Sequence, residues 1–468
     1  MLFNSLDFAV FLALVLALTL VLGHRAQNRF LLVASYAFYA AWDWRFLALI
    51  AISTAVDFTV GLRLERTDEP GRRKALAAAS LTVNLGILGF FKYAGFFAES
   101  LAELAGVFGV TLSAFTLDVV LPVGISFYTF QTLSYTLDVY RRQVPATHDL
   151  LDFALYVAFF PQLVAGPIER ATRLLPQVQA PRTVGVASVV SGGWLVFWGL
   201  FKKVVIADNL APLVDAVYAP GATVSGPEVL LATYAFAFQI YCDFSGYTDI
   251  ARGVARMLGF DLMRNFDLPY LASSVTDFWR RWHVSLSTWL RDYLYIPLGG
   301  NRKGASRTRV NLMLTMLLGG LWHGAAWTFV IWGAYHGALL VLHRALSPLL
   351  ARLGDGRPVR VLRVAVVFHL VCLGWVFFRA EDLPHALSLL GALVVGPWSA
   401  GVAGQWMLPL AVLLAPLLVL QAFEAWTGDR APVMRLPVAA RSLVYVVMFT
   451  AFVLLGEDGG QPFVYFQF

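Results

Sequence analysis

The sequence predicts an all-α integral membrane protein that crosses the bilayer many times. Of its 468 residues, 59% are hydrophobic and only 14% are charged, whereas soluble domains carry about 25% charged residues. Several apolar runs reach or approach the ~20 residues that a helix needs to cross the hydrocarbon core. The clearest runs are residues 6–22, 46–62, 312–342, 364–378, 407–423 and 443–455. Weaker runs lie between them, so we expect roughly ten or more membrane helices.

The basic balance of the chain indicates a cytoplasmic membrane face rather than a nucleic-acid partner. The net charge is +6 at pH 7, and the cytoplasmic loops of membrane proteins carry an excess of Lys and Arg. The basic stretches 24–29 and 63–74 are separated by two predicted helices, so both are expected in the cytoplasm. No Lys or Arg precedes the first apolar run, which we expect to be a membrane helix rather than a cleaved signal.

One continuous amphipathic helix is expected over residues 277–295, inside the most basic part of the chain. An apolar stripe recurs there at helical spacing, formed by Trp279, Trp282, Leu286, Trp289, Leu290 and Tyr293. A neighbouring face carries Arg280, His283, Ser287 and Arg291. Such a helix suits either the bilayer interface or a water-filled cavity at membrane depth.

His323 is the strongest candidate for catalytic chemistry. It interrupts the apolar run 312–342 between Gly320 and Gly324, and polar residues inside membrane segments are costly and therefore functional candidates. Desolvation favours the neutral imidazole that a general base requires. Taken alone, the residue fits equally well a buried histidine bound to a backbone carbonyl. His283 is the second candidate, with a snorkelling interfacial side chain as its alternative.

The remaining polar residues of the apolar runs give weaker signals. His336 and His343 lie seven residues apart and are expected at a helix contact. Asp243 and Asp249, near the end of an apolar run, either form a proton or ion site or pair with a nearby arginine. No metal site is predicted, because histidine, cysteine and acidic residues do not recur at ligand spacing. The two cysteines, at positions 242 and 372, are expected to be buried thiols.

Five stretches of the sequence together carry a family pattern. They are residues 122–131 (PVGISFYTFQ) running on to 138–141 (DVYR), 160–167 (FPQLVAGP), 241–247 (YCDFSGY), 265–266 with 278–301, and 317–324 (LLGGLWHG). In order and spacing, and over most of the chain, they resemble the membrane-bound O-acyltransferase family, specifically its branch of bacterial alginate O-acetyltransferases.

The resemblance implies a fold and two catalytic residues. The family fold is a ring of membrane helices around a central funnel, built here from one integral membrane domain, residues 1–468. Within it we expect N-terminal helices at 1–118, a core that carries the motifs at 119–345, and C-terminal helices at 346–468. Carried over onto matching positions, His323 is the catalytic base and His283 a second site residue near the tunnel.

The aromatic end of the chain, residues 462–468 (PFVYFQF), resembles the ending seen in this branch and in a companion peptide of D-alanyl transfer. One hypothesis is that Tyr465 accepts the acyl group and passes it to an extracytoplasmic partner. The alternative is an aromatic anchor at the bilayer interface.

The resemblance also implies the donor and the partners. The acyl donor is acetyl-CoA, used as a substrate rather than a resident cofactor, and basic side chains attract its phosphates. The candidates are Arg280, Arg281, Arg291, Arg302 and Lys303. A periplasmic esterase-like partner of the SGNH type and an exported polysaccharide acceptor complete the system, in the bacterial inner membrane.

Three alternatives remain open at the level of sequence. Another acceptor is possible within the family: peptidoglycan, cellulose, teichoic acid, a lipid or a secreted peptide. A proton-coupled transporter would use His323, Asp243 and Asp249, but no internal repeat of the kind transporters show is evident. A non-catalytic scaffold for a synthase complex would leave the buried histidine unexplained.

Overall fold

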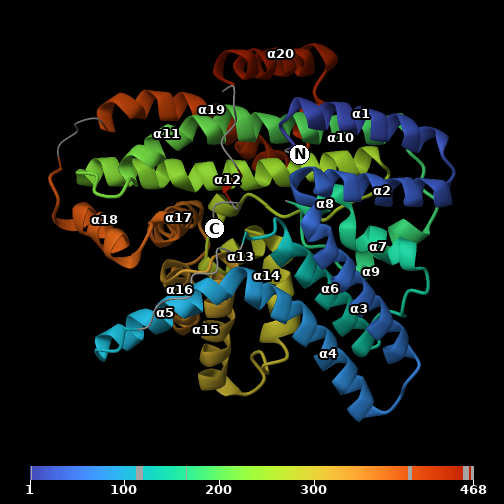
Figure 1. Cartoon of the computed structure of the whole chain (residues 1–468). Helices are drawn as coiled ribbons and strands as arrows, with labels where there is room; N and C mark the ends of the chain where they lie inside the picture. The colour runs from blue at the N-terminus through green and yellow to red at the C-terminus, as the bar shows by residue number, and fades with distance from the viewer. Residues whose placement is uncertain (2, 112–119, 165, 399–402, 457–462, 465–468) are drawn as a thin grey trace. The chain divides into compact units, whose positions relative to one another are not determined.

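The computed structural model is built from α-helices joined by short turns, without a strand among the residues that it describes (Figure 1). These are residues 1, 3–111, 120–164, 166–398, 403–456 and 463–464. Seven helical segments within them are long and apolar enough to cross a membrane: His24–Glu65, Pro70–Val107, Val186–Val217, Trp327–Ala351, Arg357–Arg379, Ala403–Thr427 and Val438–Leu455. The prediction of an all-α, multi-pass membrane protein is confirmed, and the count of ten or more membrane helices stays a prediction.

The chain divides into two compact units, Met1–Gly193 with Ala251–Met263, and Trp194–Ile250 with Arg264–Phe468. The first unit contains α1 (Leu6–Val21), α2 (His24–Asp43), α3 (Leu47–Glu65), α4 (Pro70–Leu88), α5 (Ala94–Val107), α6 (Ile125–Tyr140), α7 (Leu150–Ala158), α8 (Phe160–Leu163) and α9 (Ala171–Gln179). The expected division of the chain into N-terminal helices at 1–118, a motif-bearing core at 119–345 and C-terminal helices at 346–468 stays a prediction.

A buried polar network ties together three helices of the first unit. Asp57 of α3 is fully buried and accepts hydrogen bonds from Thr136 of α6 at 2.8 Å and from Asn84 of α4 at 2.9 Å. Ser80 of α4 donates to the same carboxylate. Because an unsatisfied polar group is costly in an apolar interior, these bonds fix the register of α3, α4 and α6.

The second unit holds every residue of the candidate site. Its helices include α11 (Asp208–Val217), α13 (Val275–Arg281), α14 (Val284–Leu290), α15 (Gly304–His323), α16 (Trp327–Ala351), α17 (Arg357–Arg379), α18 (Leu383–Val395), α19 (Ala403–Thr427) and α20 (Val438–Leu455). Two helices, α10 (Val186–Leu200) and α12 (Gly226–Met257), run from one unit into the other.

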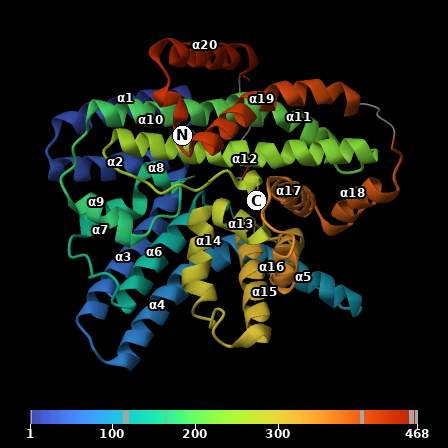
Figure 2. The same cartoon turned by 180° about the vertical axis from the view of Figure 1, so that it is seen from behind.

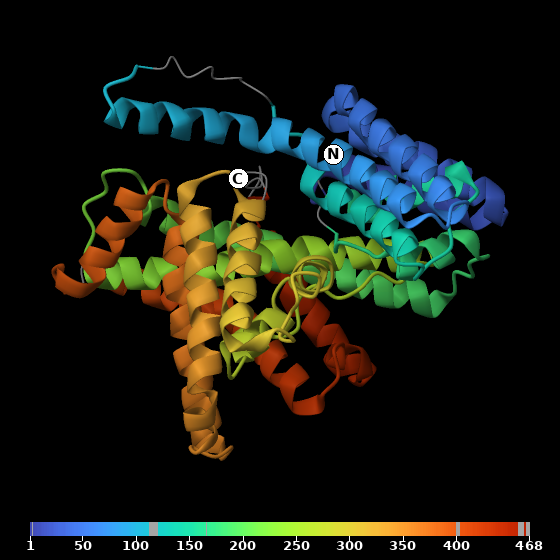
Figure 3. The ribbon, with the colours of Figure 1, turned by 90° about the horizontal axis from the view of Figure 1, so that it is seen from below.

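The apolar run 312–342 does not form one helix but an antiparallel pair, α15 and α16, which lie side by side in Figures 2 and 3. The chain becomes extended at Gly324 and Ala326, where it turns between the two helices. A Cβ on Gly320 would overlap the carbonyl oxygen of Phe329, and one on Gly333 would overlap that of Met316. The two helices therefore approach at backbone contact distance because both positions are glycine.

The expectation of one helix over residues 277–295 is wrong. The segment consists of α13 and α14 followed by a π-helical turn, Arg291–Tyr295. The break falls at His283, whose φ of 43° is in the left-handed region that non-glycine residues rarely adopt. The spacing of the apolar side chains predicted one continuous helix. That spacing carries no information about the tertiary hydrogen bonds that hold His283 outside the helical conformation.

Candidate functional site

His323 is the last residue of α15 and lies at the point where the chain turns into α16. Its side chain is buried, with 4% of the residue exposed. Aromatic rings surround it, the ring centroids of Trp322, Trp332 and Phe378 lying 5.2, 5.1 and 5.5 Å from that of the imidazole. The imidazole is thus enclosed largely by aromatic rings and faces a cavity on one side.

His283 lies beside His323, with 6.1 Å between the ring centroids. Its Nδ1 is 3.1 Å from Oδ1 of Asn265. The same oxygen accepts from the backbone N–H of Ser285 at 3.2 Å and from the Ser285 hydroxyl at 2.9 Å. An amide oxygen carries no hydrogen and can only accept, so Nδ1 of the neutral His283 ring carries the proton and Nε2 is its acceptor nitrogen.

The conformation of His283 follows from the same asparagine. The backbone N–H of Val284 donates to the backbone carbonyl of Asn265 at 2.8 Å, so both the main chain and the side chain of Asn265 hold the α13–α14 break. Full burial lowers the pKa of His283 to about 3. This histidine is therefore neutral at every physiological pH.

Asn265 gives a test of this arrangement. Asn265→Ala removes the acceptor of three buried donors, and we expect a loss of about 1–3 kcal/mol in the free energy of unfolding, together with a lower transfer rate. Asn265→Asp keeps an acceptor at the same place and is expected to retain most of the stability. Thermal unfolding of both variants in detergent measures the difference. Equal destabilisation by the two substitutions would contradict the assigned role.

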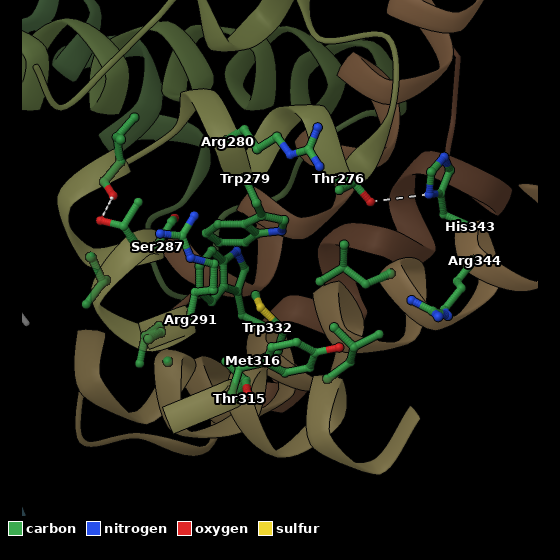
Figure 4. Close-up of a pocket in the computed structure, with 18 of the residues that line it drawn as sticks. Thr276, Trp279, Arg280, Ser287, Arg291, Thr315, Met316, Trp332, His343 and Arg344 are labelled. Carbon is green, nitrogen blue, oxygen red and sulfur yellow. Dashed lines mark hydrogen bonds between the residues drawn. The ribbon is translucent and has the colours of Figure 1, made fainter. Parts of the chain in front are cut away.

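A cavity of about 820 Å³ opens next to His323. It lies between α13, α14, α15 and α16, and Figure 4 shows ten of its lining side chains by label. The lining is aromatic and apolar on one part, including Trp279, Trp332 and Met316, and basic on another. The basic part consists of Arg280, Arg291, His343 and Arg344. A cavity of this size and mixture of apolar walls with few polar groups is typical of a small-molecule site.

The predicted basic residues differ in where they lie. Arg280 and Arg291 line the cavity, whereas Arg281 is bound to Asp277 of its own helix at 2.9 Å. Arg302 and Lys303 are exposed in the turn before α15, and the structure does not bring them into the lining.

Sequence reasoning missed Arg344 and Asn265. Arg344 adjoins His343 at the end of an apolar run, a position that alone indicates nothing more than a membrane boundary. Asn265 stands in one of the family-like stretches, but its contact with His283, 18 residues away, is set by the fold. His343, expected at a helix contact, lines the cavity and is 3.3 Å from the hydroxyl of Thr276 (Figure 4). His336 is fully buried against the rings of Phe278, Trp279 and Trp332.

Asp243 and Asp249 pair with lysines rather than with an arginine. Lys203 Nζ is 2.8 Å from Asp243 Oδ1, and Lys202 Nζ is 2.6 Å from Asp249 Oδ2. Both cysteines are buried free thiols, as predicted. Tyr465 lies outside the described residues, so its role stays a prediction.

Comparison with known proteins agrees with the family pattern in the sequence. The model of the membrane-bound O-acyltransferase family matches residues 141–378. The chain is 41% identical to a probable alginate O-acetylase of Azotobacter vinelandii, over 100% of both chains. It is 46% identical to a probable alginate O-acetylase of Pseudomonas aeruginosa, over 85% of this chain and 76% of that one. It is also 37% identical to a peptidoglycan O-acetyltransferase of Helicobacter pylori, over 78% and 73% of the two chains.

The matched region contains the α15–α16 hairpin, both site histidines and the cavity. The prediction of an O-acyltransferase is confirmed by this match and by the relatives. The chain belongs to the membrane-bound O-acyltransferase family.

Proposed function

We propose that this protein moves an acetyl group from cytoplasmic acetyl-CoA to an exported, alginate-like polysaccharide, in the bacterial inner membrane. The observation that carries the proposal is the meeting of His323 with a cavity that also presents arginines. A buried base can activate the attacking hydroxyl, and a basic surface beside it can attract the phosphates of the thioester donor. The relatives named as alginate O-acetylases support the choice of acceptor.

In this reaction the acetyl group moves from the sulfur of the CoA thioester to the oxygen of an attacking hydroxyl. An attacking hydroxyl loses its proton to His323, its oxygen forms a bond to the thioester carbonyl carbon, and the C–S bond breaks. The proton then passes from His323 to the departing CoA thiolate. A positioned base of this kind contributes about 10²–10⁴ in rate. The hydroxyl belongs to Tyr465 or to a serine of an extracytoplasmic SGNH-type partner.

Two structural expectations belong to this proposal. The helices form a ring around a funnel, and the funnel lets the acetyl group cross while CoA stays in the cytoplasm. The hydrogen-bonded His283 presents its acceptor nitrogen beside His323, where it orients either the attacking hydroxyl or the catalytic imidazole.

Donor binding is predicted to depend on the three arginines of the cavity, Arg280, Arg291 and Arg344. Replacing all three with alanine is expected to raise the KM for acetyl-CoA about tenfold, because an exposed ion pair contributes about 0.5 kcal/mol. The kcat is expected to change little. Arg302 and Lys303 do not line the cavity, so the matched double variant Arg302→Ala/Lys303→Ala should keep the parent's KM for acetyl-CoA. A larger effect from the double variant would move the donor site to the turn before α15.

A second acceptor is favoured by one observation, the similarity to a peptidoglycan O-acetyltransferase. Two acceptors can be distinguished by deleting the gene for this protein from its host. Ester-linked acetate is then measured separately on exopolysaccharide and on peptidoglycan. Loss from the exopolysaccharide alone, restored by the wild-type chain, supports the proposal. Loss from peptidoglycan alone would replace the acceptor while leaving acyl transfer intact. The transporter alternative is not favoured, since Asp243 and Asp249 are each paired with a lysine.

A further inference from the structure

The cavity is elongated along α16, and its two ends differ in chemistry. The residues of α16 that line it recur at helical spacing, on one face of the helix: Trp332, Leu340, His343, Arg344 and Ser347. Trp332 and Arg344 are twelve residues apart, which is about 18 Å along the helix axis at a rise of about 1.5 Å per residue. His323 adjoins Trp332, with 5.1 Å between the ring centroids. Arg344 and the proposed base therefore lie toward opposite ends of the cavity.

In the proposed function, this arrangement sets the direction of the donor. Phosphates held by Arg344 and the other basic side chains leave the thioester to reach the end of the cavity that His323 and Trp332 form. A general base acts on a hydroxyl within about 2.6–3.2 Å, and the attacked carbonyl carbon then lies about 3–3.5 Å from that hydroxyl. The acyl chain therefore begins beside the indole ring of Trp332.

Trp332 closes this end of the cavity with a ring that is packed on its far side. Only 1% of the residue is exposed. Its indole stacks on that of Trp375, with 5.9 Å between centroids, and lies 5.3 Å from Phe378 and 4.8 Å from His336. These three rings are buried behind the indole, outside the residues that line the cavity. Because protein interiors are close-packed, an added methylene there causes strain.

The position of Trp332 is also fixed by its own main chain and by a neighbouring helix. A Cβ on the next residue, Gly333, would overlap the carbonyl oxygen of Met316, so α16 is held against α15 at this level. Trp279 of α13 lines the cavity beside Trp332 (Figure 4), with 5.6 Å between the ring centroids. The indole is thus held by side chains of α13 and α17 and by the α15–α16 contact.

We infer that Trp332 is a specificity-determining residue, whose indole limits the transferred acyl group to about the size of acetyl. The inference rests on the proposed function and deepens it, because it names the side chain that selects the acyl group. A longer thioester undergoes the same reaction, in which the C–S bond breaks, the C–O bond forms and His323 carries the proton to the thiolate. The difference is the room for further methylene groups, which the indole occupies.

A series of straight-chain donors tests this assignment. We expect the parent to prefer acetyl-CoA over propionyl-CoA by at least about tenfold in kcat/KM, since one methylene in a closed apolar site contributes about 10–200-fold. Trp332→Ala opens the end of the cavity and is expected to lower that preference by at least about tenfold, with Trp332→Phe between the two. Release of the CoA thiol is measured in membrane vesicles from a host that lacks the gene and carries each variant.

The ratio of the two kcat/KM values does not depend on how much of a variant is folded, so it stays informative if Trp332→Ala lowers the yield. Leu340→Ala is the matched control, because it enlarges the same cavity eight residues farther along α16. We expect it to keep the parent ratio. Equal use of both donors by the parent, an unchanged ratio in Trp332→Ala or an equal change in Leu340→Ala would overturn the inference and leave acyl transfer in place.

Binding of inert analogues reports the size limit without turnover. S-ethyl-CoA and S-butyl-CoA are thioethers with no carbonyl carbon to attack. We expect the purified parent to bind S-ethyl-CoA at least about tenfold more tightly than S-butyl-CoA, and Trp332→Ala to bind both with similar affinity, as measured by isothermal titration calorimetry. Equal binding by the parent would overturn the inference. If the parent releases no CoA from any donor but discriminates between the thioethers, the size limit stands and the catalytic part of the proposed function fails.

Discussion

Replacing His323 with alanine is expected to lower the rate of acetyl transfer by about 10²–10⁴-fold, the contribution of a positioned general base. The residue is buried at the turn between α15 and α16 and lines the cavity assigned to the donor. His323→Gln is the sharper variant, because glutamine keeps a polar side chain of similar volume but cannot accept a proton near neutral pH. Release of the CoA thiol from acetyl-CoA measures both rates.

His369 offers a matched control for this experiment. It lies on α17 and bonds to the hydroxyl of Tyr234 at 2.8 Å, away from the cavity lining. We expect His369→Ala to keep the parent rate. If His369→Ala and His323→Gln were equally active in well-folded samples, His323 would be a packing residue and the base would have to be sought elsewhere.

The second large effect is expected from the glycines that join α15 and α16. Gly320→Ala places a methyl group onto the carbonyl oxygen of Phe329, and neither backbone can move without separating the hairpin. Overpacking of this kind costs about 1–3 kcal/mol, and we expect the upper end because the obstacle is backbone. The transfer rate should fall as well, since His323 is three residues farther along the same helix.

Gly391 supplies the control for the hairpin. It is also a helical glycine of the second unit, in α18, but an added Cβ meets nothing within 4 Å. Gly391→Ala is therefore expected to be neutral or slightly stabilising, because alanine has the higher helix propensity. Thermal unfolding of both variants gives the comparison, and a Gly320→Ala variant as stable as Gly391→Ala would show that the two helices are not held at backbone contact.

Composition and motif order predicted the class of the molecule well. A chain with few charges and long apolar runs has to satisfy its backbone hydrogen bonds within helices, so the all-α membrane architecture follows directly. The sequence singled out His323 through the resemblance of its Trp-His-Gly stretch to the family pattern, because the residue taken alone fits a buried structural histidine equally well; its catalytic role stays a prediction.

Local patterns failed where tertiary contacts decide the backbone. The apolar stripe over 277–295 predicts one helix, yet Asn265 binds both the side chain of His283 and the backbone N–H of Val284 and breaks it. The partners of Asp243 could not be predicted either: Lys203 comes from a π-helical turn, and Val464 comes from the far end of the chain. Contacts across such separations leave no periodic signal.

The proposed function depends first on base catalysis by His323 in the transfer of the acetyl group from CoA. Intact-protein mass spectrometry after incubation of the purified protein with acetyl-CoA tests it most directly. We expect the parent to gain the mass of one acetyl group and His323→Gln to gain none; Tyr465→Phe also gains none where Tyr465 is the accepting hydroxyl. An equal gain by parent and His323→Gln, in folded samples, would contradict it.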